Sequence, residues 1–182
     1  MDTELVIQAQ RGDKRAFAAI AATVADQYLA VSRRILRDLV LAEDATQQAL
    51  LSIWQDLPQL RDPARFDAWS YRLLVRACYA EASRSRRSRF GVHVLEIENQ
   101  HGVNELDAVV DRDVLERAFQ RLPIDQRTVV VLRHYLDLPA DEVADTLGVP
   151  VGTVHSRLHY AIRALRAAID ADTRLAPEVA VR

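Results

Sequence analysis

Hydrophobic residues recur every three or four positions over most of the chain, which is the spacing of one face of an α-helix. The first such run follows Asp13, a favourable N-cap, and its apolar residues are Phe17, Ile20, Ala21, Val24, Tyr28, Val31 and Ile35. A second helix is predicted from near Ala42 to about Leu57. A third begins at Asp62 and Pro63, since proline suits the first helical position. Its predicted inward face consists of Phe66, Trp69, Leu73, Ala77 and Ala80.

The periodicity stops after the arginine cluster at residues 84–89 and returns at Val114. Between them, GVHVLEIENQHGVNELD (91–107) contains two glycines and several acids but no sustained pattern. Further helices are predicted over 114–122, after Pro123, over PADEVADTLG, and after Pro150. We therefore expect an all-α fold with two small helical domains, residues 1–90 and 111–170. An acidic linker (91–110) joins them, and a tail (171–182) follows.

Composition narrows the class of protein. The chain has 182 residues, 49% of them hydrophobic, which is ordinary for a globular protein with a buried core. The single cysteine, Cys78, excludes an internal disulfide and fits a reducing cytoplasm. The N-terminus lacks the pattern of a signal peptide, and no apolar run approaches the roughly 20 residues of a membrane span.

Charge is unevenly distributed although the formal net charge is only −2. Residues 61–89 contain eight basic and three acidic residues, whereas residues 90–151 contain five basic and twelve acidic residues. Residues 152–182 are again basic, with five basic and three acidic residues. This pattern predicts two separate DNA contacts with an acidic segment between them.

GVPVGTVHSRLHYAIRALR (148–166) has the pattern of the turn and second helix of a helix-turn-helix. A recognition helix presents its first turns to base edges and its arginines to phosphates. Six residues are expected to contact DNA: Thr153, His155, Ser156, Arg157, Tyr160 and Arg163. We call these six residues and His159, which lies on the same outward face, the recognition set. The alternative is an ordinary amphipathic helix of a bundle.

A second candidate surface lies on the third predicted helix. Spacings of seven, four, three and seven place its members along one side, predicted to face away from the core. We call them the arginine stripe: Arg65, Arg72, Arg76, Tyr79 and Arg86. Arginines contact phosphates, and an aromatic ring among them can stack on an unpaired base. The alternative is a solvated charged face. Trp54 and Trp69 are expected in the core.

A third candidate surface lies on the second predicted helix, opposite its buried residues. One leucine is surrounded there by polar groups, as in a protein docking site with an apolar anchor. We call this set the docking arc: Asp44, Gln47, Gln48, Leu51 and Gln55. The alternative is a solvated face with one exposed leucine.

No catalytic or metal-binding signature competes with these surfaces. The sequence has no G-x-S-x-G and no H-E-x-x-H pattern, so we expect no catalysis. His155 and His159 are spaced i, i+4, but no third ligand is evident, so we expect no metal. No cofactor is expected either.

The motifs together resemble an extracytoplasmic-function (ECF) sigma factor of the sigma-70 superfamily. RGDKRAF, AEDATQQALLSIW and FDAWSYRLLVRACYAEASRSRR are similar to its sigma-2 domain. LPIDQRTVVVLRHYLDLPADEVADTLGVPVGTVHSRLHYAIRALR is similar to its sigma-4 domain. The resemblance covers residues 4–168 in the family's order and spacing.

The resemblance implies partners for each surface. The docking arc would bind core RNA polymerase, with Asp44 and Gln47 at positions that grip its clamp helices. The arginine stripe would engage the promoter's −10 element and its melted strand, and the recognition set would contact the −35 element. The linker would thread the polymerase cleft, and an anti-sigma factor is an expected partner. The polymerase would then supply most of the non-specific phosphate contacts, so the chain itself would not need a positive net charge.

The sequence departs from the family pattern at a few positions. Gln48 replaces a glutamate, and Ala77 and the Ala80–Glu81 pair stand where asparagine and aspartate are usual. His155, Tyr160 and Ile162 replace positions that are often basic. The main alternative function is a free-standing helix-turn-helix repressor or response regulator, which would bind duplex DNA unaided. A structural helical adaptor is a third alternative, but it leaves the arginine stripe unexplained.

Overall fold

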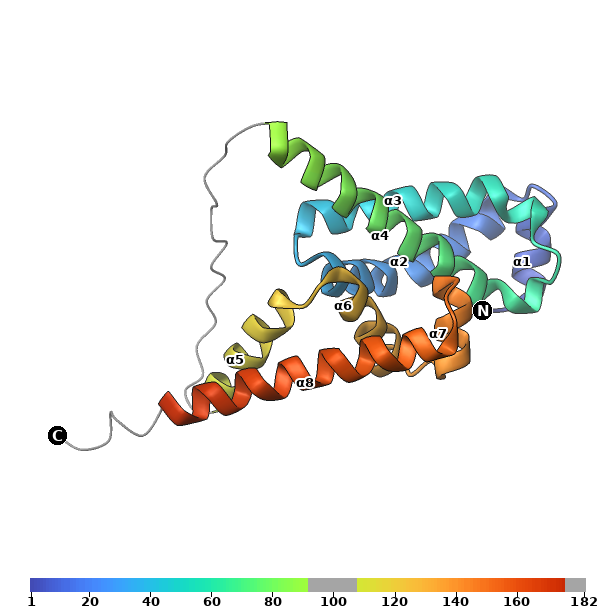
Figure 1. Cartoon of the computed structure of the whole chain (residues 1–182). Helices are drawn as coiled ribbons and strands as arrows, with labels where there is room; N and C mark the ends of the chain where they lie inside the picture. Colours follow the sequence, from blue (N-terminus) through green and yellow to red (C-terminus); the bar gives the residue numbers. More distant parts are fainter. Residues whose placement is uncertain (92–107, 176–182) are drawn as a thin grey trace.

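The computed structural model describes residues 1–91 and 108–175, and this described part consists of helices joined by short turns, without a strand (Figure 1). Most of the predicted acidic linker, residues 92–107, lies outside the described residues. The helices form two units, which we call the N-terminal unit (α1–α4) and the C-terminal unit (α5–α8).

The N-terminal unit is a bundle of α1 (Thr3–Gln10), α2 (Lys14–Leu36), α3 (Leu39–Asp56) and α4 (Phe66–Gly91). Two short 3-10 segments, η1 (Leu57–Gln59) and η2 (Pro63–Arg65), connect α3 to α4. Carboxylate caps define the helix starts: Asp13 accepts from two backbone N–H groups of α2, and Asp38 accepts from the Leu41 N–H. In the core, the Tyr28 hydroxyl is bonded to Ser70 Oγ at 2.5 Å.

The C-terminal unit contains α5 (Ala108–Arg121), α6 (Ile124–Val130), the π-helical segment η3 (Val131–Tyr135), α7 (Ala140–Leu147) and α8 (Val151–Leu175). Gly148 ends α7 with a φ of 66°, a left-handed conformation that costs glycine little. This turn lets α8 start three residues later, with Val143 and Val154 both fully buried. The predicted helix-turn-helix is therefore formed.

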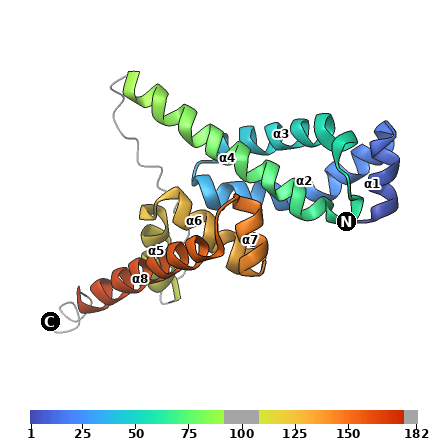
Figure 2. The ribbon, with the colours of Figure 1, turned by 45° about the vertical axis from the view of Figure 1, so that its right-hand side comes forward.

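The two units pack against each other in the described structure. α4 contacts α7, and α2 contacts α6 and η3. Buried residues of both units belong to one continuous hydrophobic cluster, which extends from Val6 through Leu74 to Val154. Figures 1 and 2 show α7 beside the first half of α4 from two directions, while the ends of α4 and α8 project from the packed region.

Several boundaries and faces differ from the prediction. The sequence pattern missed α1, whose apolar face is reduced to a few residues, with Val6 and Ala9 buried. The second predicted helix starts at Leu39 rather than Ala42, because Asp38 is its cap. α8 continues to Leu175, five residues into the expected tail, because nothing disfavours the helix before Pro177.

The inward face predicted for α4 was wrong in part. Ala80 is exposed and Leu73 is only partly buried, whereas Leu74 is fully buried. The face is rotated by about one residue because it includes two polar residues that a count of apolar positions omits. These are Ser70, bonded to Tyr28, and Glu81, which accepts two short bonds from Arg84 at 2.6 and 2.8 Å.

Candidate nucleic-acid and polymerase interfaces

The docking arc is presented to solvent by α3. All five members, Asp44, Gln47, Gln48, Leu51 and Gln55, are exposed. The opposite side of the helix anchors it: Ala42, Ala45, Ala49 and Ile53 are fully buried. Leu51 keeps 55% of its surface in water, which is unfavourable for a leucine unless a partner covers it.

An apolar hollow of about 560 Å³ lies beside the docking arc, between α2 and α3. Its lining is Lys14, Phe17, Ala21, Gln47, Leu50, Leu51 and Trp54. The rings of Phe17 and Trp54 pack at a tilt with centroids 4.7 Å apart, so Trp54 is half-buried at the edge of this hollow. The sequence patterns did not predict the hollow, because it forms only where two helices meet.

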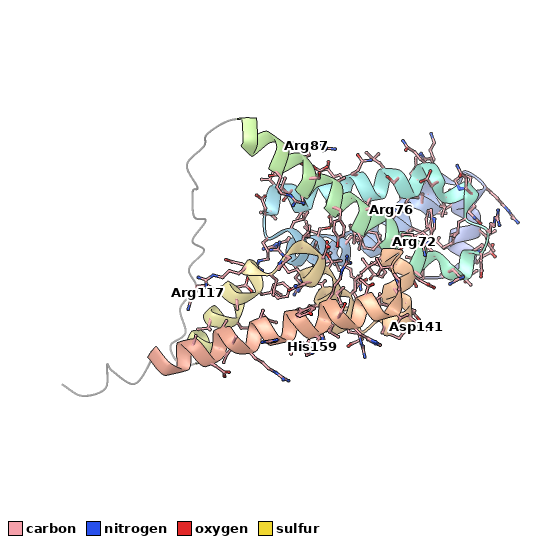
Figure 3. All side chains as sticks on the ribbon, in the orientation of Figure 1. Arg72, Arg76, Arg87, Arg117, Asp141 and His159 are labelled. Carbon is pink, nitrogen blue, oxygen red and sulfur yellow. The ribbon has the colours of Figure 1, made fainter. Side chains whose placement is uncertain are left out.

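The arginine stripe follows one side of α4, but its members differ in exposure. Arg65, Arg76 and Arg86 are exposed, whereas Arg72 and Tyr79 are half-buried. Figure 3 shows Arg72 and Arg76 where α4 passes α7, and Arg87 near the free end of α4. The predicted outward orientation is therefore wrong in part for Arg72 and Tyr79, because the C-terminal unit packs beside them.

A cavity of about 430 Å³ occupies the contact between stripe and C-terminal unit. From α4 it is lined by Arg72, Val75, Arg76 and Tyr79, and from the C-terminal unit by Asp125, Arg157 and residues 145–149. Burial raises the pKa of Tyr79 to about 12, and this side chain lines the cavity together with Asp125.

The recognition set lies on the first half of α8. His155, Ser156, His159, Tyr160 and Arg163 are exposed, and Thr153 and Arg157 are half-buried. The inward side is held by Val154 and Ala161, both fully buried. The Ser156 hydroxyl donates to the Thr153 carbonyl at 3.0 Å, and the ring of His159 meets that of Tyr160 edge-on. Arg157 donates to Asp125 Oδ2 at 3.1 Å.

The described residues were also searched for metal-ligand clusters and for membrane-spanning helices. Within residues 1–91 and 108–175, no group of three or more His, Cys, Asp or Glu side chains is placed to hold a metal ion. In the same ranges, no helix combines the length and the apolar character needed to cross a membrane.

Cys78 is buried beside Ser32, and burial raises the pKa of its thiol to about 11.

Family models match both units: Sigma-70 region 2 over residues 20–88, and Sigma-70 region 4 over residues 112–165. The ECF RNA polymerase sigma factor SigL of Mycobacterium tuberculosis is 33% identical over 166 residues, which cover 85% of this chain and 92% of SigL. The chain belongs to the ECF RNA polymerase sigma factors. The RNA polymerase sigma-H factor of Pseudomonas aeruginosa is 29% identical to this sigma factor over 180 residues. The match covers 92% of this sigma factor and 93% of the Pseudomonas protein.

Solved structures agree with the fold. CnrH, in complex with the cytosolic domain of CnrY, matches with a TM-score of 0.67 and 25% identity, covering 94% of this chain and 98% of CnrH. RpoE of Bartonella quintana, in complex with the anti-sigma factor NepR, matches with a TM-score of 0.68 at 21% identity, over 86% of this chain and 98% of RpoE. The chain therefore acts in transcription initiation, as a sigma factor that directs RNA polymerase to promoters.

Proposed function

We propose that the three surfaces divide the work of a sigma factor among α3, α4 and α8. The docking arc binds core RNA polymerase through Leu51 and its polar neighbours. The arginine stripe engages the −10 element and its melted strand, and the recognition set contacts base edges of the −35 element in duplex DNA. The observation that carries this division is that all five residues of the docking arc are exposed, around a leucine beside an apolar hollow.

The chemistry of each surface supports its assignment. Leu51 and the hollow offer apolar area to a partner protein, and Asp44 with three glutamines offers hydrogen-bonding groups around it. On α4, exposed guanidiniums suit phosphates, and the Tyr79 ring suits an unpaired base. On α8, the exposed side chains of His155 and Ser156 lie in the first turns, which approach base edges in a helix-turn-helix.

We further propose that the protein works in the cytoplasm without catalysis of its own, and that an anti-sigma factor regulates it. The similarity to CnrH, whose solved structure contains the cytosolic domain of CnrY, supports such a partner. An anti-sigma factor that covers the docking arc would exclude core polymerase. Both proteins should therefore compete for this sigma factor.

Run-off transcription with purified core polymerase tests the function directly. Transcripts should begin at defined promoters only when this chain is added. A free-standing repressor would instead bind a palindromic duplex tightly by itself and would not support initiation. Lack of run-off transcripts across a genomic promoter library, together with tight binding by the free protein, would overturn the proposal.

A further inference from the structure

The cavity beside α4 contains two arginines that the protein itself does not neutralise. Arg72 and Arg76 line the cavity from α4, and Arg157 lines it from α8. Arg157 is paired with the Asp125 carboxylate at 3.1 Å. In the described part of the chain, neither Arg72 nor Arg76 forms an ion pair or a side-chain hydrogen bond. Two positive charges at this cavity therefore lack a partner.

Arg72 has the less favourable surroundings of the two. Its side chain is half-buried, and its Nε is buried without a hydrogen-bond partner. Thr146, which lines the same cavity, also has a buried hydroxyl without a partner. A cation that is withdrawn from water is stabilised only when hydrogen bonds or an opposite charge replace its hydration. An anion bound to Arg72 would supply both.

The size of the cavity limits the anion to a small molecule. Its volume of about 430 Å³ lies within the usual range of small-molecule sites, about 300–1,000 Å³. Figure 3 places Arg72 and Arg76 on the part of α4 that passes α7, and residues 145–149 line the cavity from the α7 side. A continuous nucleic-acid strand does not fit into this volume, whereas a single nucleotide does.

The lining residues also indicate the chemical class of the anion. Arg72 and Arg76 are four residues apart, on one face of α4, so their guanidiniums can bind neighbouring phosphate oxygens. Tyr79 follows three residues later on the same face and lines the cavity with an aromatic ring, on which a base can stack.

Asp145 of α7 adds an acceptor for the base. It lines the same cavity and is exposed, and its carboxylate forms no bond with another described residue. A carboxylate has two oxygens and can accept bonds from two neighbouring N–H groups. Guanine presents two such donors side by side, its ring N–H and its amino group, whereas adenine presents only an amino group.

We propose that this cavity binds a guanine nucleotide, with its phosphates on Arg72 and Arg76. Its base stacks on Tyr79 and donates to Asp145. The bound nucleotide occupies two arginines of the stripe. If the stripe engages the −10 element, as proposed above, the nucleotide therefore inhibits promoter opening.

Isothermal titration calorimetry of the full chain, without DNA, tests the site. GDP should bind roughly tenfold more tightly than ADP or pyrophosphate, because only GDP combines the phosphates with a base that donates to a carboxylate. Arg72→Ala and Arg76→Ala should each weaken GDP binding about tenfold, the effect of one lost charge-assisted hydrogen bond. Arg86→Ala is the matched control: it removes an exposed stripe arginine that does not line the cavity, so GDP affinity should be unchanged.

Asp145→Asn separates recognition of the base from recognition of the phosphates. It removes a negative charge from the lining, so pyrophosphate should bind more tightly. The preference for GDP over ADP should nevertheless disappear. Asp141→Asn makes the same change in charge at the start of α7, outside the lining, and should alter neither value (Figure 3).

No binding of GDP, or equal binding of GDP and pyrophosphate by the parent chain, would overturn the proposal. Equal weakening of GDP binding by Arg72→Ala and Arg86→Ala would also overturn it, because the arginines would then act only through general charge. In run-off transcription, GDP should lower the transcript yield of the parent more than that of Asp145→Asn. Transcription by a parent chain that does not bind GDP would refute the site alone, whereas GDP binding by a chain that supports no transcription would refute the proposed function alone.

Discussion

Leu51 is the sharpest test of the polymerase interface, because its expected contribution follows from its exposure. Complete burial of a leucine is worth about 1.5–3 kcal/mol, and 55% of Leu51 remains to be covered. Binding that completes its burial should therefore gain about 1 kcal/mol from this side chain. Leu51→Ala should weaken the affinity for core polymerase about fivefold.

The same helix supplies a matched control. Leu39 is 50% exposed on α3, close to the value for Leu51. It lies twelve residues earlier, which is about 18 Å along the axis and about 120° around it. Leu39→Ala removes the same atoms from a similarly exposed site outside the docking arc, so it should leave polymerase affinity unchanged.

Fluorescence anisotropy of labelled protein, titrated with core polymerase, measures both dissociation constants. Circular dichroism should show the same helix content in the parent and both variants, because neither leucine is buried. Equal affinities for Leu51→Ala and the parent would refute the docking assignment. Equal weakening by the two substitutions would show that exposed leucines on α3 act without regard to position, which would also refute it.

Four other substitutions test DNA contact, a buried hydrogen bond and pH dependence. His155→Ala should change the ranking of −35 variants, by about 1–3 kcal/mol per lost base contact. Arg163→Ala should weaken binding to all promoters alike and lower the salt dependence of the binding constant by about one unit of slope. Filter binding with holoenzyme distinguishes the two effects. Tyr28→Phe should lower the free energy of unfolding in urea by about 1 kcal/mol, because it removes the 2.5 Å bond to Ser70 while Ser70 keeps its bond to a backbone carbonyl. Burial raises the thiol pKa of Cys78 from 9.0 to about 11. The free energy of unfolding should therefore be unaffected by this thiol below about pH 9 and should fall as the pH rises towards 11. Cys78→Ala should flatten the dependence of the free energy of unfolding on pH in this window, and an unchanged slope would contradict the assignment to Cys78.

Local rules predicted most of the helices from the sequence. The carboxylate of Asp13 before an apolar-periodic run, and Gly148 followed by Pro150, determine helix ends through contacts within a few residues. The outward orientation of the docking arc followed from the 100° turn per residue and is confirmed by the exposure of all five members. These features depend on neighbours in sequence, which a periodic pattern records.

Contacts between distant segments were not predictable in this way. Tyr79 carries no local signal that it lines a cavity together with Asp125, which lies 46 residues later in the chain. In the sequence, Glu81 stood out only as a departure from the family pattern. Its burial and its pairing with Arg84 were not predicted. Periodicity counts apolar positions, so it misses a buried face that uses polar residues in satisfied pairs.

The formal net charge of this chain is only −2, and carboxylates already occupy some of its arginines. Affinity for DNA grows with the number of phosphates that a protein neutralises, because each releases a condensed counterion. Arg157 is instead paired with Asp125, and Arg37 with Glu116. On the proposed assignments, Arg157 must exchange a carboxylate for DNA, which reduces the net gain from that contact. A weak intrinsic affinity then suits a factor that should select promoters only after core polymerase has bound α3, since unproductive complexes with non-promoter DNA remain rare.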